Sequence, residues 1–203
     1  MRGVARLGRA LAVAAAVGLA AVGCGGDDGN PANNNGNNNN IGGSVPIEKW
    51  MTKNLDVETD GGSWCYDDDP ANCDKYGRLY TWEAAKSACQ LVGMRLPTRE
   101  EWDALVTASG GENTAGKKLK SRNGWYNNGN GTDDFGFSAL PGGSRLSNGY
   151  FHNAGNAGSI GVWWEATEDG SYAYGRYMSY DGNGVNKFGN GKDYGYSVRC
   201  VQD

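Results

Sequence analysis

The placement of five cysteines constrains this chain of 203 residues more than any other feature of its sequence. Cys24 ends an apolar stretch near the N-terminus, whereas the other four cysteines lie between residues 65 and 200. Four cysteines can pair in three ways, and in an oxidising compartment they are expected to form two disulfides. The residues before Cys24 indicate such a compartment.

The first 23 residues have the features of a signal peptide. Three arginines precede an apolar run over residues 11–22, which is too short to span a bilayer comfortably and ends in small residues. The small residues before Cys24 resemble the lipobox of bacterial lipoproteins, although Ala21 stands where that motif usually has Leu. The resemblance implies that the Cys24 thiol is acylated, for example with palmitate, and anchors the protein to a membrane. The alternative is ordinary secretion with a free Cys24.

Residues 24–43 are expected to form a disordered tether. Their Gly, Asp and Asn residues show no apolar periodicity and cannot bury enough surface to offset the entropy of the chain. A flexible spacer after an acyl anchor would hold a globular domain, residues 44–203, away from the membrane. We therefore expect a location in the bacterial cell envelope outside the cytoplasm, at the outer membrane or the cell surface.

The four remaining cysteines favour a structural role. Cys65 and Cys73 are separated by a polar stretch that can turn, which leaves Cys89 to pair with Cys200. The second link would join an early helix to the last strand and constrain the unfolded chain by roughly 4–5 kcal/mol in the entropy model. A zinc site is disfavoured, because the chain has no C-x-x-C pair and His152 is its only histidine.

Composition bounds the fold and the partners. The chain has 34 Gly, 7 Trp and 11 Tyr but only 38% hydrophobic residues, so its core must combine aromatic side chains with short elements and many turns. This composition favours a loop-rich α+β domain over a helical bundle or a doubly wound sheet. A net charge of −4 provides no basic field for nucleic acid.

Two helices are expected early in the domain, followed by an irregular, twisted antiparallel sheet. Thr81 is a good N-cap for a helix over residues 81–89. Thr98 and Glu101 form a capping box for a helix that ends at Gly110. Short aromatic runs punctuated by Gly predict the strands: 47–54, 135–140, 162–164, 174–178 and 196–201.

Several segments resemble the Fibrobacter succinogenes major paralogous domain (FISUMP) family. The matching segments are Trp50–Leu55, Trp64–Cys73, Lys75–Trp82, Arg95–Thr98 with Glu101-Trp102, and Gly195–Val201. One departure is the start, because that family usually has a strand pair ahead of Trp50. We therefore expect an edge of the sheet to be bare or differently closed.

The Arg-Leu-Pro-Thr and terminal Val-Arg-Cys elements also resemble the formylglycine-generating-enzyme and C-type-lectin-like group. That resemblance implies a C-type-lectin-like α+β fold and no established activity, since likeness of fold does not assign chemistry.

An enzyme is not expected. Formylglycine-generating enzymes need two closely spaced reactive cysteines near the C-terminus, and this chain has Cys200 alone there. No G-x-S-x-G elbow accompanies His152. Glu165 and Glu168 could form a glycosidase pair, but a solvated or hydrogen-bonded role is favoured for both.

No cofactor or metal is assigned, although calcium is an alternative. Three loops supply the oxygen ligands that calcium prefers: Asp67–Asp69, Asp133-Asp134 and Asp181–Asn183. None fits an EF-hand, and Asp and Asn in Gly-rich turns commonly bond their own backbone.

Aromatic residues in the second half of the domain make carbohydrate or surface-ligand binding the leading functional hypothesis. Exposed rings can stack on sugars, although most of these rings are expected to fill the core. The alternative is a structural or adhesive envelope protein without a small ligand. The candidate ligand-binding residues are Trp125, Tyr126, Trp163, Trp164, Tyr174 and Tyr177.

Overall fold

The computed structural model describes residues 47–152 and 156–203, all within one compact unit that spans residues 40–203. The signal peptide, Cys24 and the tether predicted for residues 1–43 lie outside the described residues. The helices are η1 (Ile47–Lys49), η2 (Tyr66–Asp68), α1 (Pro70–Tyr76), α2 (Trp82–Leu91), α3 (Arg99–Ala108), α4 (Ala115–Leu119) and η3 (Tyr126–Asn128). The strands are β1 (Ser63–Trp64), β2 (Leu79–Tyr80), β3 (Ile160–Asp169), β4 (Tyr172–Ser179) and β5 (Asn186–Gly191).

The two predicted helices are confirmed, with the caps that the sequence indicates. The Thr81 side chain accepts a hydrogen bond from the Ala84 amide at the start of α2. Thr98 and Glu101 form the complete capping box at the start of α3. The polar stretch between Cys65 and Cys73, by contrast, contains α1 as well as a turn, because Asp69 caps the helix and a proline opens it.

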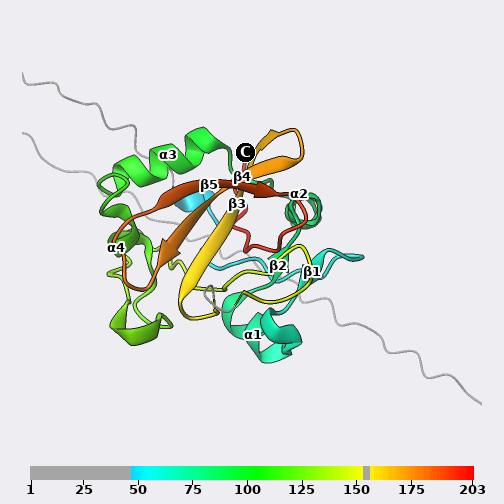
Figure 1. The fold of residues 1–203 in the computed structure, drawn as a ribbon. Helices are drawn as coiled ribbons and strands as arrows, with labels where there is room; N and C mark the ends of the chain where they lie inside the picture. The colour runs from blue at the N-terminus through cyan, green and yellow to red at the C-terminus, as the bar shows by residue number, and fades with distance from the viewer. Residues whose placement is uncertain (1–46, 153–155) are drawn as a thin grey trace, which may run out of the picture. The chain divides into compact units, whose positions relative to one another are not determined.

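Both sheets are antiparallel. β1 and β2 form a two-stranded sheet, and β3, β4 and β5 form a three-stranded sheet in that order (Figure 1). A tight turn at Gly170, whose φ is 59°, joins β3 to β4. A register shift between Trp164 and Glu168 bends β3. The fold is therefore α+β with irregular antiparallel sheets, as predicted, and β1, β2 and β5 are additional strands.

Three of the segments predicted as strands do not form continuous strands in the structure. Residues 135–140 are interrupted at Ser138, whose φ of 50° is not extended, and only Ala139 bridges, to Lys120. Residues 196–201 change partner along their length, pairing singly with β2, with β3 and with the segments around residues 50 and 95. Residues 47–49 form η1, after which Trp50 bridges to Val201. Each of these segments contacts several neighbours, so none forms a continuous ladder with one of them.

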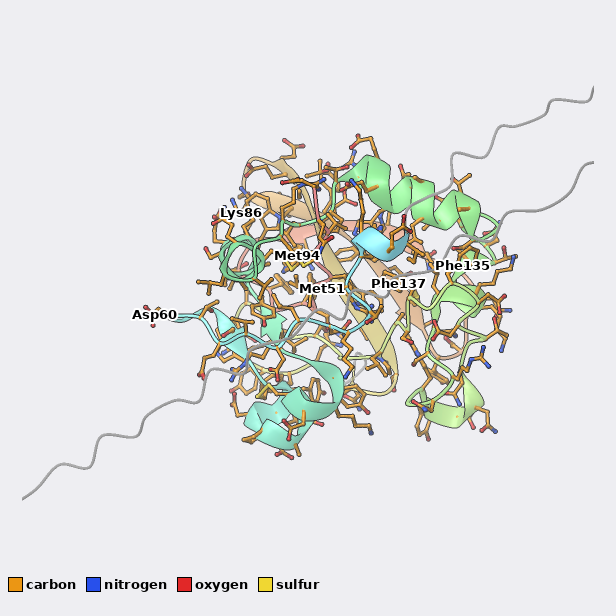
Figure 2. The ribbon with its side chains drawn as sticks, turned by 180° about the vertical axis from the view of Figure 1, so that it is seen from behind. Met51, Asp60, Lys86, Met94, Phe135 and Phe137 are labelled. Carbon is orange, nitrogen blue, oxygen red and sulfur yellow. A yellow bond between two sulfur atoms is a disulfide. The ribbon has the colours of Figure 1, made fainter. Side chains whose placement is uncertain are left out.

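The core has two hydrophobic clusters, one against each face of the three-stranded sheet. Successive side chains of a strand point to opposite faces, so the fully buried Trp163 and Trp164 belong to different clusters. The Trp164 cluster packs against α2, and the Trp163 cluster packs against α3 and α4. Figure 2 labels Phe137 of the second cluster near Met51 and shows Asp60 at the tip of an exposed loop.

Both predicted disulfides are present. Cys65 pairs with Cys73, and Cys89 pairs with Cys200 across 111 positions of sequence. The second disulfide is fully buried in the Trp164 cluster and links α2 to the C-terminal segment. Within the described ranges, no helix is long and apolar enough to cross a membrane.

Candidate functional site

The structure places the three candidate tryptophans in the core, which corrects the prediction that they bind a ligand. Trp163 and Trp164 are fully buried and Trp125 is 5% exposed. Each indole N–H donates inward: Trp125 to the Ala139 carbonyl, Trp163 to Asn54 Oδ1 and Trp164 to the Tyr80 carbonyl. A domain with few large aliphatic residues uses these rings to fill its interior, so they offer no face to a ligand.

The three candidate tyrosines reach the surface but form no common platform. Tyr126 in η3 is 64% exposed, and its ring stands nearly perpendicular to that of Tyr180, at an interplanar angle of 81°. Tyr174 and Tyr177 are three residues apart on β4 and therefore project from opposite faces of the sheet. Stacking on a row of coplanar rings is not available here.

A hollow of about 300 Å³ beside β4 and β5 brings Tyr174 together with charged side chains. It combines the ring of Tyr174 with side chains that can donate and accept hydrogen bonds. Gly189 helps to leave it open, since a Cβ there would lie 3.3 Å from the Tyr174 ring. The lining residues are Arg99, Glu165, Tyr174, Gly175, Arg176, Lys187, Phe188 and Gly189.

Glu165 and Arg176 form a buried ion pair at the base of this hollow. Their side chains are each 1% exposed, and Oε2 of Glu165 lies 2.8 Å from Nη2 of Arg176. Oε1 of Glu165 accepts from Nε of Arg99 at 3.1 Å. The carboxylate is thus held between two guanidinium groups, which fixes the direction of all three side chains.

The ion pairs extend outward from the base. Asp103 lies 3.0 Å from both Arg176 and Lys187, and Lys187 also lies 3.1 Å from Glu112. These contacts raise the pKa of Lys187, chiefly through Asp103. With Glu165 and Arg99, the network contains three cations and three carboxylates, so it is electrically balanced.

Local structure positions Arg99 over the hollow. Arg99 directly follows the Thr98 cap of α3, and its guanidinium carbon lies 4.3 Å from the centroid of the Tyr174 ring. The hydrogen bond to Glu165 is the main cause of a raised pKa for Arg99. Arg99 is only partly buried, so its remaining N–H groups are available to a bound molecule.

Sequence reasoning missed most of this site. The sequence favours a solvated or hydrogen-bonded role for Glu165 and Glu168 over a glycosidase pair. The structure buries Glu165 between two arginines, whereas Glu168 forms an ion pair with Lys192 and does not line the hollow. Arg99, Arg176 and Lys187 carry no local signal, because their partners are distant in sequence. Tyr174 is the one lining residue that the sequence predicts to bind a ligand.

Other hollows are more polar or smaller. A large one, of about 610 Å³, lies next to α1 and is lined by residues that include Asn54, Asp74 and Asn123. Another, of about 210 Å³, lies beside Tyr177 on the opposite face of the sheet from Tyr174. Asn54 is committed to the core through Trp163, so the large hollow lacks a comparable set of free, fixed groups.

The Asp-rich loops are used for local structure. Asp69 accepts from the Ala71 amide at the start of α1, and Asp133 accepts from the Ser138 amide. Across residues 47–152 and 156–203, no group of three or more His, Cys, Asp or Glu side chains could hold a metal ion. The calcium alternative therefore gains no support from these loops.

Comparison with known proteins identifies a family. A family model described as the Fibrobacter succinogenes major domain matches residues 34–202, which is most of the chain. No curated protein matches the chain. No solved structure matches it either.

Proposed function

The chain belongs to the Fibrobacter succinogenes major domain family, and we propose that it is a cell-envelope lipoprotein that recognises a carbohydrate or another surface ligand. In this proposal a lipid on Cys24 anchors the protein outside the cytoplasm, and the domain is C-type-lectin-like. The ligand binds at the hollow formed by α3, β4 and β5. No enzymatic step is proposed.

The observation that carries the proposal is the fixed set of donors and acceptors beside an aromatic ring. Sugars present hydroxyl groups that both donate and accept hydrogen bonds, and apolar ring faces that pack on aromatic side chains. Arg99 offers donors whose direction Glu165 fixes, while the Tyr174 ring supplies apolar contact. A balanced network attracts no particular charge, which favours a neutral, hydroxyl-rich ligand.

A structural or adhesive role is the second candidate, and one observation favours it. The Glu165–Arg176 pair is already matched within the domain, so it can stabilise the fold without any ligand. The exposed tyrosines Tyr126, Tyr150 and Tyr172 stand singly, as surface aromatic residues commonly do.

Binding of the full chain to an array of glycans and cell-wall polymers, with and without calcium, tests the proposal. We expect saturable binding that Arg99→Gln weakens by about tenfold or more, because it removes a charged donor. Tyr172→Ala is the control, since Tyr172 is exposed on β4, next to the hollow, but does not line it. Absence of binding by the folded, oxidised chain would favour the structural role, and strict calcium dependence would contradict the assigned site.

The anchor is tested separately with Cys24→Ser. We expect this variant to lose lipid-dependent processing and to leave the membrane fraction, whereas the unchanged chain stays with it. If the Cys24→Ser variant is still processed and still found in the membrane fraction, the proposed lipid attachment is contradicted.

A further inference from the structure

We infer that the free edge of β5 is a docking surface for a second copy of this chain. Two β5 strands would pair antiparallel about a two-fold axis at Phe188 and join two three-stranded sheets into one of six strands. This inference does not rest on the proposed ligand binding, although Lys187, Phe188 and Gly189 also line the hollow.

The hydrogen-bonding pattern shows which backbone groups of β5 face outward. The Lys192 amide donates to the Ser171 carbonyl just before β4 begins. Hydrogen-bonded pairs alternate with non-bonded pairs along an antiparallel ladder, so the β4–β5 pairs 173–190, 175–188 and 177–186 are the bonded ones. The backbone groups of Lys187, Gly189 and Gly191 therefore point away from β4.

Four of these outward groups lack a partner among the described residues. The Gly191 amide donates to Asn190 Oδ1 at 3.0 Å, and the Gly191 carbonyl accepts from the Tyr194 amide at 3.2 Å. The N–H and C=O groups of Lys187 and Gly189 make no hydrogen bond to any described residue. Both residues are exposed, and β5 is the last strand in the sheet order (Figure 1).

A symmetric pairing uses all four groups. When Phe188 of one copy faces Phe188 of the other, Lys187 faces Gly189 on both sides of the axis. The four N–H and four C=O groups then match as one short ladder of alternating donors and acceptors. The two Phe188 residues form the closer, non-bonded pair, in which aromatic side chains on one face contact each other.

The usual protections of an edge strand are missing from β5. Proteins block such edges with proline, bulges or projecting charges, and β5 has no proline and pairs with β4 without a register shift. Its one charged residue is Lys187, whose ammonium group is held by Asp103 and Glu112. In the symmetric pairing no like charges oppose each other, because Gly189 faces Lys187, and this match favours a second copy over an unrelated peptide.

Two variants of opposite charge at Gly189 test the inference in the full chain. Gly189→Lys places a second positive charge opposite Lys187 twice per dimer, whereas Gly189→Asp places a negative charge there. Both variants bring the same Cβ to 3.3 Å from the Tyr174 ring, so each controls for the other's local crowding. By sedimentation velocity in density-matched detergent, we expect the dimer dissociation constant of Gly189→Lys to exceed that of Gly189→Asp by roughly tenfold.

Cross-linking tests the register. In a non-bonded antiparallel pair the facing Cα atoms are about 4.5 Å apart, which a disulfide can bridge. Phe188→Cys should therefore form a disulfide-linked dimer under mild oxidation, much faster than Tyr150→Cys at an exposed site elsewhere. If Phe188→Cys disturbs folding, an equal mixture of Lys187→Cys and Gly189→Cys chains should give the same linked dimer.

A chain that is monomeric at every concentration, with equal behaviour of the two Gly189 variants, would overturn the inference. Cross-linking of these cysteines to a different envelope protein, and not to a second copy, would also overturn it. Either result leaves the proposed ligand binding unaffected, because that binding is measured on the array with a single chain.

Discussion

Arg199 donates its Nε–H to Oδ1 of Asn54 at 2.7 Å, across 145 positions of sequence, and both side chains are buried. The other N–H groups of Arg199 donate to the carbonyls of Met51, Phe137 and Ser138. No carboxylate in the described part of the chain lies within ion-pair distance of it. Neutral oxygens therefore hold this cation, which joins the first segment, the 133–138 loop and the C-terminal segment.

Replacing Arg199 should destabilise the domain strongly. Arg199→Met keeps most of the volume but leaves three backbone carbonyls without their donor, and Asn54 Oδ1 keeps only the indole N–H of Trp163. Because unsatisfied buried acceptors cost free energy, we expect the free energy of unfolding to fall by about 3 kcal/mol. Urea unfolding measures it. The exposed Arg122 gives the matched control, Arg122→Met, for which a change within about 0.5 kcal/mol is expected; equal stabilities of the two variants would contradict the role given to Arg199.

Lys120 should make stability increase with pH in the mildly alkaline range. Its buried ammonium donates to the carbonyls of Ser179 and Gly182, and burial, aided by Lys117, lowers its pKa to about 8. Between that value and the ordinary pKa near 10.5 the unfolded chain binds more protons than the folded chain, so raising the pH favours folding. We expect a gain of about 1–2 kcal/mol between pH 8 and 9.5, measured by urea unfolding.

Lys120→Met should abolish that increase, which separates it from other titrations. Above about pH 10 an opposite effect begins, because burial raises the pKa of Tyr80 and Tyr196 and only the unfolded tyrosines ionise. Stability should then fall with pH in both proteins. A slope between pH 8 and 9.5 that is the same with and without Lys120 would disprove the assignment.

The parts of the fold that local sequence encodes could be predicted, and the rest could not. α2 and α3 can be predicted from their N-caps, Thr81 and Thr98, because each cap bonds to a residue within four positions of it. β5 has the sequence Asn-Lys-Phe-Gly-Asn-Gly, with one apolar side chain, so it lacks the alternation that indicates a strand. It is extended because β4 offers it a ladder.

The candidate site depends on contacts that no local pattern records. Arg99 and Glu165 are 66 positions apart, and the register of β4 on β3 brings Arg176 to the other side of the Glu165 carboxylate. The aromatic content did predict rings in the core, but not which ones, since Trp163 and Tyr174 lie in similar short runs. The structure distinguishes the two: Trp163 is buried in the core, whereas Tyr174 lines the hollow.

The two disulfides should differ in their contribution to stability. The Cys89–Cys200 link spans 111 positions and the Cys65–Cys73 link spans 8. The entropy of the unfolded chain that each link removes corresponds to roughly 5 and 2.5 kcal/mol. Replacing each pair by alanine should therefore lower the free energy of unfolding about twice as much for the long link, as measured by urea unfolding under oxidising conditions. Equal losses would mean that effects in the folded state outweigh loop length.

The ion pair between Glu165 and Arg176 should be strongly coupled. Glu165→Gln leaves the buried Arg176 with Asp103 as its one charged partner within the described residues. We expect this change to lower the free energy of unfolding by about 3 kcal/mol, because an uncompensated buried charge is costly. When Arg176→Met is added, the total loss should be smaller than the sum of the two single losses.

A double-mutant cycle measured by urea unfolding gives the coupling, which should exceed about 1.5 kcal/mol. The control cycle uses Lys187 and Glu112, whose side chains are 47% and 60% exposed and are therefore screened by solvent. Exposed pairs couple by less than about 1 kcal/mol, so the control cycle should be close to additive. Additivity in both cycles would show that Glu165 and Arg176 are stabilised separately by their other neighbours, and that the base of the hollow is less rigid than the contacts of Arg99 imply.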